Sequence, residues 1–140
     1  MAEAMTLFDK ALSNFNAARI LRDFMGDDEE QLNIIAYHLQ QSLEFSIKYS
    51  LEMNGIEYPK THSIEQLVRI AEKNSVDLNL GEYIEEHCEM FSSWEEKSRY
   101  ILGYPVEVKK IDRAIKEVDD YLKGFGSLKN NDGNGNEMLI

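Results

Sequence analysis

The longest helical pattern in the chain is residues 29–53, EEQLNIIAYHLQQSLEFSIKYSLEM, followed by Asn54-Gly55 as a C-terminal cap. At about 100° per residue, two sets of apolar side chains fall on nearly opposite sides of this helix. The first set is Leu32, Ala36, Leu39, Leu43, Ile47 and Leu51, and the second is Ile34, Phe45 and Tyr49. A helix that is apolar on two sides is covered on two sides. It is therefore either the central helix of a bundle or a helix that also contacts a second subunit.

A narrow polar wedge separates the two apolar sides and consists of Tyr37, Gln41, Glu44 and Lys48. Glu44 and Lys48 have the favourable four-residue order for an ion pair on a helix. Polar groups that are buried need hydrogen-bond partners. Two interpretations therefore stay open: the wedge bonds to neighbouring helices and to itself, or it forms a ligand site.

Helical periodicity predicts four further helices, over residues 6–25, 63–74, 80–100 and 108–125. Two of them begin at capping boxes, in which Thr6 precedes Asp9 and Ser63 precedes Gln66. Pro59 falls between helical patterns, where a helix breaker is tolerated. We therefore expect an all-α, five-helix, up-and-down bundle in residues 1–125. Residues 126–140, rich in Asn and Gly and without periodicity, are expected to form a flexible, disordered tail.

Composition restricts the class of protein. The chain has 140 residues, one domain's worth, with 26 acidic and 15 basic side chains and a formal charge of -11. This balance disfavours binding to bulk nucleic acid, which requires a basic surface, although it allows a local basic patch. No signal peptide and no run of about 18 apolar residues is present, so we expect a cytoplasmic protein that does not enter a membrane.

The sequence carries no recognised cofactor or metal motif. Bundles that hold two metal ions place Glu three residues before His, but Ile35, Pro59 and Ile84 precede the three histidines at that spacing. The single cysteine, Cys88, lies in an apolar helical setting and is expected to be a buried structural thiol. No metal and no cofactor is therefore predicted.

His62 and Arg99 are the remaining candidates for a functional role. His62 stands at a helix start after a proline turn, where it either locks the loop or lines a cleft. Arg99 and Tyr100 end a helix. An arginine at that position either bonds to the terminal carbonyl groups or presents its guanidinium group to a phosphate.

Taken together, these residues resemble the HEPN domain family, over roughly residues 8–123. The matching motifs are a Gln-x-x-Glu-x-x-x-Lys helix (Gln41, Glu44, Lys48), a Thr-His helix start (Thr61, His62) and Ser98-Arg99-Tyr100 near Pro105. The resemblance implies a small helical bundle, commonly a dimer, of the prokaryotic type associated with minimal nucleotidyltransferases. Such proteins are tied to nucleotide- or RNA-related stress and defence systems, including toxin–antitoxin pairs.

Many relatives are metal-independent RNases that use an arginine followed by a histidine four to six residues later. Arg99 is followed at those offsets by Gly103, Tyr104 and Pro105, and no other arginine in the chain has a histidine at that spacing. The catalytic pair of those relatives therefore cannot be carried over. Ile101 to Tyr104 also separate Arg99-Tyr100 from Pro105, which departs from the family's Arg-Tyr-Pro segment.

The resemblance and the residues favour a non-catalytic HEPN module that dimerises and binds a nucleotide or a partner nucleotidyltransferase. The expected site residues are Gln41, Glu44, Lys48, His62, Arg99 and Tyr100, with no catalytic residue assigned. One alternative is a metal-independent RNase with an altered active site that uses His62 or His38. Another is a purely structural dimeric bundle whose polar wedge only satisfies itself.

Overall fold

The computed structural model describes residues 5–25, 29–100 and 105–132, and only the backbone of residues 25, 29, 30, 98–100 and 126–132. These residues form helices and no strand, which confirms the all-α class. The helices are α1 (Leu7–Met25), α2 (Glu29–Met53), α3 (Ile64–Lys73), α4 (Glu82–Glu86), α5 (Cys88–Tyr100) and α6 (Val108–Asp132). No helix among the described residues is long and apolar enough to cross a membrane.

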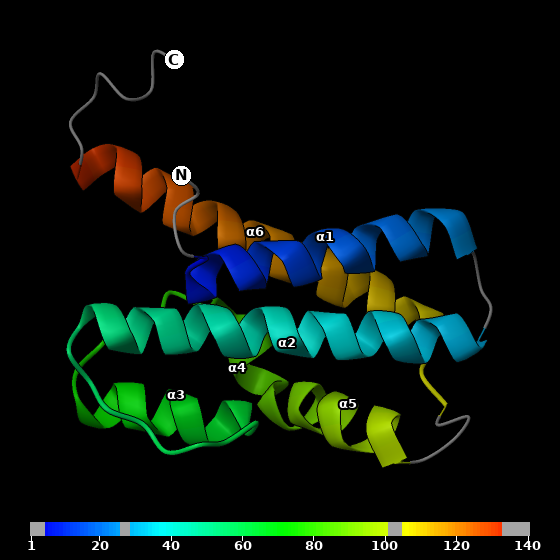
Figure 1. Cartoon of the computed structure of the whole chain (residues 1–140), viewed down its shortest axis with the longest axis horizontal. Coiled ribbons are helices and arrows are strands. Elements are labelled where there is room, and N and C mark those ends of the chain that lie inside the picture. Colours follow the sequence, from blue (N-terminus) through cyan, green and yellow to red (C-terminus); the bar gives the residue numbers. More distant parts are fainter. Residues whose placement is uncertain (1–4, 26–28, 101–104, 133–140) are drawn as a thin grey trace.

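Helix α2 is the central helix of the bundle. It packs against α1, α3, α5 and α6, with α1 and α6 on one side of it and α3 and α5 on the other (Figure 1). Every member of its larger apolar set is at most 1% exposed. On its opposite side, α1 covers two aromatic residues: the Phe8 and Tyr49 ring centroids are 5.5 Å apart, and Lys10 Nζ lies 5.7 Å from the Phe45 ring. Only Ile34 of the smaller set remains substantially exposed, at 44%.

Local sequence signals fix the helix ends that the pattern predicts. Thr6 donates its backbone N–H to Asp9 at 2.9 Å, and Asp9 returns one to the Thr6 hydroxyl at 3.0 Å. This reciprocal capping box satisfies two amide groups that have no partner inside α1. Helix α2 ends before Gly55, whose φ of 70° is a conformation that suits glycine. Both ends agree with the sequence-based expectation.

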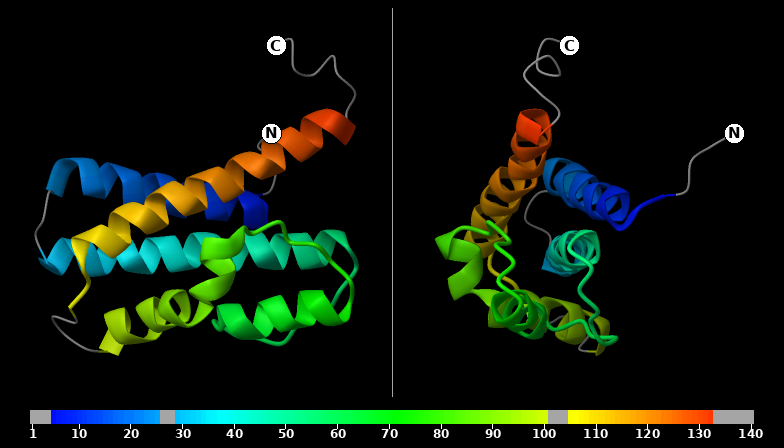
Figure 2. Two further views of the ribbon diagram at one scale, coloured as in Figure 1. Left: turned by 180° about the vertical axis from the view of Figure 1, so that it is seen from behind. Right: turned by 90° about the vertical axis from the view of Figure 1, so that its left-hand side faces the viewer.

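The helix expected at residues 80–100 is interrupted at His87. The φ of -116° and ψ of 22° at His87 leave the helical region, so α4 ends at Glu86 and α5 begins at Cys88. The interruption lets the two segments pack on different neighbours, because α4 contacts α6 whereas α5 contacts α2 and α3. Helix α5 and α3 lie roughly end to end in one layer (Figure 2). The described residues thus form six helices rather than the expected five.

The last helix is longer than the periodicity predicts. A helix ending at Phe125 and a tail beginning at Gly126 are expected, but the backbone of α6 stays helical to Asp132. Loss of the apolar pattern removes the packing partner of a helix but not its internal hydrogen bonds, so the end of the pattern is a poor guide to the end of the helix. Residues 133–140 lie outside the described residues, and the domain boundary at 125 stays a prediction.

Candidate functional site

Five polar side chains come together where α2 faces the start of α3. We call them the Glu44 cluster, which consists of Gln40, Gln41, Glu44, Lys48 and His62. The first four follow one face of α2, since residues three and four apart are neighbours on a helix. His62 belongs to the loop that leads into α3. Three of the predicted wedge residues and His62 are therefore brought together, an arrangement that both the self-bonded interpretation and the ligand-site interpretation of the wedge predict.

Glu44 is the centre of this cluster. Its side chain is only 3% exposed. Oε2 accepts a hydrogen bond from Lys48 Nζ at 2.8 Å, whereas Oε1 lies 3.0 Å from Nδ1 of His62 and accepts from Nε2 of Gln40 at 3.0 Å. A buried carboxylate is costly unless it is paired and hydrogen-bonded, and here both oxygen atoms have partners. The predicted Glu44–Lys48 ion pair is thereby confirmed.

Gln40 is a member of the cluster that the sequence analysis missed. It is completely buried, and Nε2 also donates to the main-chain carbonyl oxygen of His62 at 3.0 Å. Its Oε1 accepts from Nε2 of Gln41 at 2.6 Å. Gln40 therefore ties α2 to the loop before α3 through the backbone. Its position four residues before Glu44, the same spacing that joins Glu44 to Lys48, is the signal that could have found it.

His62 is the outward-facing member of the cluster. Its side chain is 55% exposed, while Nδ1 points to the buried Glu44. A carboxylate acceptor favours the form of the ring that carries a proton on Nδ1. In the neutral ring, Nε2 is then left as an acceptor. The arrangement can present one ring nitrogen to a ligand while the other is held in place.

Capping interactions hold the loop that carries His62. The Ser63 hydroxyl accepts from the backbone N–H of Gln66 at 3.1 Å, which confirms the predicted capping box as the N-cap of α3. The backbone N–H of Ile64 donates to the Ser92 hydroxyl of α5 at 2.9 Å. Because its neighbours are anchored to both α3 and α5, the position of His62 is fixed by the bundle.

Tyr58 closes the edge of the cluster beside Lys48. Lys48 Nζ lies 5.6 Å from the centre of the Tyr58 ring, and the Tyr58 hydroxyl donates to Oε2 of Glu52 at 2.6 Å. Burial, followed by this hydrogen bond and the negative charge of Glu52, raises the pKa of Tyr58 above its ordinary value. Tyr58 therefore stays neutral and can act as a hydrogen-bonding group at this edge.

The remaining predicted residues are not part of the described cluster. Tyr37 makes no hydrogen bond to it and packs its ring edge-on to His38, with centroids 5.7 Å apart. Arg99 and Tyr100 lie in the last turn of α5, and their side chains fall outside the described residues. Their proposed role in a site stays a prediction.

The other histidines and the cysteine lie in different surroundings. His38 Nδ1 is 2.7 Å from Oδ1 of Asn14 on α1, and burial lowers the pKa of its ring. His87 Nδ1 lies 2.7 Å from the carbonyl oxygen of Tyr83 and its ring stacks on Tyr83. Cys88 is buried, as expected, and burial raises its pKa to about 11. Within the described part of the chain, no three His, Cys, Asp or Glu side chains gather as metal ligands.

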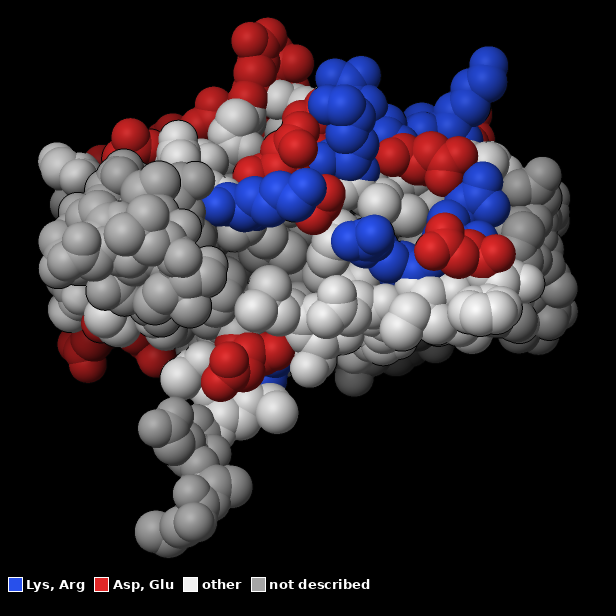
Figure 3. Space-filling view, turned by 90° about the horizontal axis from the view of Figure 1, so that it is seen from above, with Lys and Arg blue, Asp and Glu red and all other residues white. Residues whose placement is uncertain are grey.

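The basic side chains of α6 are interleaved with acidic ones. Ion pairs four residues apart join Arg113 to Glu117 at 2.8 Å and Lys116 to Asp120 at 3.3 Å. Seen from above, the charged groups of both signs alternate on this face (Figure 3). A surface of this kind neutralises itself and offers little attraction to a polyanion, in agreement with the net charge.

The sequence of the chain matches a known domain family. The family model for the HEPN domain matches residues 4–123. Since this match covers most of the chain, the protein belongs to the HEPN domain family. No significant match is found among curated proteins or among solved structures.

Proposed function

We propose that this chain is a non-catalytic HEPN module that dimerises and binds a nucleotide or a partner nucleotidyltransferase. A role as a nucleotide- or RNA-related module is what membership of the family suggests. The observation that carries the non-catalytic part is the saturation of Glu44, whose two oxygen atoms are taken up by Lys48, Gln40 and His62. Because the Glu44 carboxylate is already hydrogen-bonded within its own chain, we assign it a structural role beneath a binding surface and not a role as a reacting group.

The nucleotide part of the proposal rests on the exposed edge of the Glu44 cluster. His62 offers a half-exposed aromatic ring, and Lys48 Nζ, although mostly buried, lies beside the Tyr58 ring at this edge. A ring that is held at one nitrogen can stack on a base and accept a hydrogen bond at Nε2 with little further loss of conformational entropy. The predicted Arg99 and Tyr100 lie on the last turn of α5, at the end of that helix away from α3 (Figure 1), so their part in a ligand site is a separate element of the proposal.

The protein-binding part rests on apolar side chains exposed on α1 and α2. Phe24 is 85% exposed and Ile20 is 57% exposed, and the two lie four residues apart on one side of α1. Ile34, on the adjacent helix α2, is exposed as well. Exposed apolar groups that cluster favour contact with another protein. We assign this surface to the dimer or to a nucleotidyltransferase, as in a cytoplasmic toxin–antitoxin pair.

Calorimetric titration with ATP, GTP, CTP and UTP tests the nucleotide site. We expect binding by the wild type and about tenfold weaker binding by His62→Ala and by Lys48→Met. Lys116→Met on α6 is the control and is expected to bind normally. His62→Ala retains the main-chain oxygen that Gln40 contacts, so this variant should stay folded, which its melting curve checks. Equal affinity in all three variants would contradict a nucleotide site at this cluster.

Sedimentation and co-purification with a nucleotidyltransferase encoded next to this chain test the protein surface. We expect a dimer and a stable complex, and we expect Phe24→Asp to disrupt at least one of them. Glu96→Lys, a charge change at an exposed position on α5, is the control. A monomer that binds neither nucleotide nor nucleotidyltransferase would refute the proposal. A dimer that binds neither of them would favour the purely structural alternative.

An RNase with an altered active site is the rival function, favoured by the Glu44–His62 contact. A carboxylate that orients an exposed histidine is an arrangement that can support general base chemistry. Incubation with single-stranded RNA in the presence of a chelator separates the two functions. We expect no cleavage, and cleavage that is lost in His62→Ala or in His38→Ala would replace the binding proposal with the RNase.

A further inference from the structure

The direction of the hydrogen bonds in the Glu44 cluster decides which atoms the cluster presents to solvent. As the partner of Lys48 in an ion pair, the carboxylate of Glu44 carries no proton and can only accept. Three nitrogen atoms approach Oε1 of Glu44: Nε2 of Gln40 at 3.0 Å, Nε2 of Gln41 at 3.5 Å and Nδ1 of His62 at 3.0 Å. Each of these neighbours therefore turns an N–H toward the buried carboxylate.

Gln41 is held with its amide nitrogen inward and its amide oxygen outward. Nε2 donates to Oε1 of Gln40 at 2.6 Å as well as to Glu44, and the reverse orientation would set oxygen atoms against one another. Among the described residues, the buried polar side-chain atoms without a partner are Oδ1 of Asn33 and the Tyr121 hydroxyl. No described group donates to Oε1 of Gln41, and this atom is not one of those two, so it reaches the surface as an acceptor.

His62 is oriented in the same sense. With its Nδ1 proton directed to Glu44, the neutral ring leaves Nε2 as an acceptor on a side chain that is 55% exposed. Gln41 and His62 converge on the same oxygen of Glu44, so their two outward acceptor atoms belong to one edge of the cluster. This edge therefore calls for a ligand that donates hydrogen bonds.

Lys48 does not reverse this polarity. Its side chain is 13% exposed, and Nζ donates to Oε2 of Glu44 at 2.8 Å beside the Tyr58 ring. The charges of Lys48 and Glu44 cancel, and Gln40, Gln41 and the neutral His62 add none. The cluster itself thus offers no net positive charge to a phosphate, which binds best to cationic donors.

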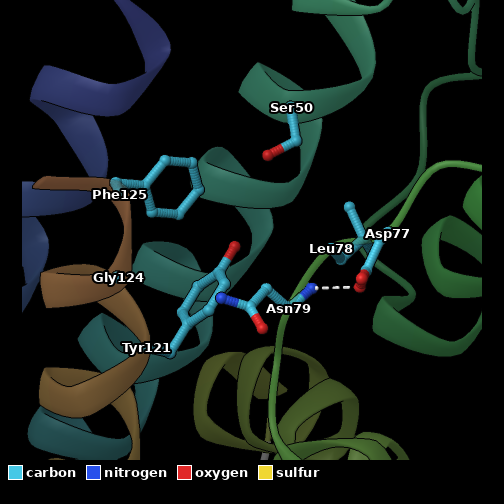
Figure 4. A pocket seen from close by; sticks show the side chains of 7 residues that line it. All are labelled: Ser50, Asp77, Leu78, Asn79, Tyr121, Gly124 and Phe125. Carbon is cyan, nitrogen blue, oxygen red and sulfur yellow. Dashed lines mark hydrogen bonds between the residues drawn. The ribbon is translucent and has the colours of Figure 1, made fainter. Parts of the chain in front are cut away.

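A cavity elsewhere in the bundle is too small to hold such a ligand. It lies between α2, α6 and the segment that joins α3 to α4, where Ser50, Asn79 and Tyr121 are among the residues that line it (Figure 4). Its volume of about 60 Å³ is well below the roughly 300 Å³ at which pockets for small molecules begin. The cavity shares no residue with the Glu44 cluster, so the argument for a ligand stays with the cluster edge.

We propose that the exposed edge of the Glu44 cluster recognises the base of a nucleotide by its amino group and not by its phosphate groups. This inference rests on the nucleotide site proposed above and specifies its ligand. Adenine, cytosine and guanine each carry an amino group that can donate to the two acceptors. Uracil carries none, and its ring N–H lies between two carbonyl oxygens that would face the acceptors. Nucleosides with an amino group therefore bind more tightly than uridine, whatever the number of phosphates.

Calorimetric titration of the wild type with adenosine, AMP and ATP separates the base from the phosphates. We expect the three dissociation constants to agree within about threefold, because the phosphates add no contact. ATP binding that is at least about tenfold tighter than adenosine binding would overturn this inference and leave the nucleotide site in place. Absence of binding by every nucleoside and nucleotide would refute the nucleotide site itself, and this inference with it.

Adenosine with two methyl groups on its amino nitrogen (dimethyladenosine) tests the donor directly, because it keeps the base but lacks the amino hydrogens. We expect the wild type to bind dimethyladenosine about tenfold more weakly than adenosine. The preference should shrink to about threefold or less in Gln41→Met, which lacks the acceptor Oε1, and in His62→Phe, which keeps an aromatic ring without Nε2.

Lys116→Met on α6 is the control for these variants and should discriminate between the two nucleosides as the wild type does. Melting curves check that all three variants fold. Exclusion of the methyl groups by shape alone would leave the preference for adenosine unchanged in both Gln41→Met and His62→Phe, and that result would overturn the proposal. Equal binding of adenosine and dimethyladenosine by the wild type would overturn it as well.

Discussion

Oε1 of Glu44 lies 3.0 Å from Nδ1 of His62, 18 residues further along the chain. The contact joins the middle of α2 to the loop that begins α3, so a polar group on one helix fixes the start of another. Gln40 reinforces the same connection through the main chain of His62. The carboxylate of this pair is buried, whereas the imidazole is half-exposed to solvent.

Glu44→Gln tests the energetic weight of the buried ion pair. The amide group keeps the shape of the side chain but leaves Lys48, whose side chain is 13% exposed, without its counter-charge. We expect the free energy of unfolding to fall by about 3 kcal/mol, measured by urea denaturation.

Asp120→Asn is the matched control for that experiment. Asp120 also pairs with a lysine four residues away, Lys116, but their side chains are 59% and 68% exposed. We expect a loss of no more than about 0.5 kcal/mol. Equal losses in Glu44→Gln and Asp120→Asn would contradict a structural role for the buried pair.

Gln40→Met tests the connection between α2 and the loop before α3. Methionine fills a similar volume but cannot donate to His62 or Glu44, so one buried and one partly buried acceptor each lose a donor. We expect a loss of about 2 kcal/mol, with faster hydrogen exchange at the start of α3. Gln41→Met, which does not remove the donor to the His62 carbonyl, should cost about half as much. A larger loss of stability in Gln41→Met than in Gln40→Met would contradict the assignment of Gln40 as the main connection between α2 and this loop.

His38 makes stability depend on pH in a predictable direction. Burial lowers the pKa of His38 from the ordinary 6.5, so below that pH the unfolded chain binds a proton that the folded chain does not. The contribution of His38 is therefore present above pH 6.5 and is lost as the pH falls toward the folded pKa. We expect the unfolding free energy of His38→Gln to change less between pH 7.5 and pH 5.5 than that of the wild type. His87→Gln, which retains His38, should keep the slope of the wild type, and an unchanged slope in His38→Gln would contradict this assignment.

Cys88 should react slowly with thiol reagents. With a pKa raised to about 11, roughly one thiol in a thousand is ionised at pH 8, and the side chain is only 7% exposed. We expect labelling by an aromatic disulfide reagent to be at least about 50-fold slower than that of a free cysteine peptide, and to become fast in denaturant. Rapid labelling of the native protein would show that the thiol is accessible.

The sequence predicted the bounds, the buried side and the ion pair of α2 because the signals for them are local. The bounds Glu29 and Met53, the buried apolar set and the Glu44–Lys48 pair all follow from helical spacing and caps, which involve residues a few positions apart. The break at His87 was missed for the opposite reason. The break depends on α4 and α5 packing against different helices. No helix-breaking residue within one turn of His87 indicates it in the sequence.

The candidate site was predicted in part. Gln41, Glu44 and Lys48 were placed on one face by spacing, and His62 was singled out by its place at a helix start. That His62 bonds to Glu44 could not be derived, because the contact requires α3 to begin opposite the middle of α2. Gln40 was overlooked because its neighbour Gln41 carried the family motif, although Gln40 is the more deeply buried of the two.

The sequence by itself determined the helical class, most of the helix starts and ends, and the ion pair within α2, since all of these depend on periodicity and on neighbours one turn away. The tertiary structure decided which polar groups are buried, which of them meet between elements, and where a small polar cavity remains beside Tyr121. Those outcomes depend on how the helices approach one another. That approach is set by the packing of the whole core around α2, and no single segment encodes it.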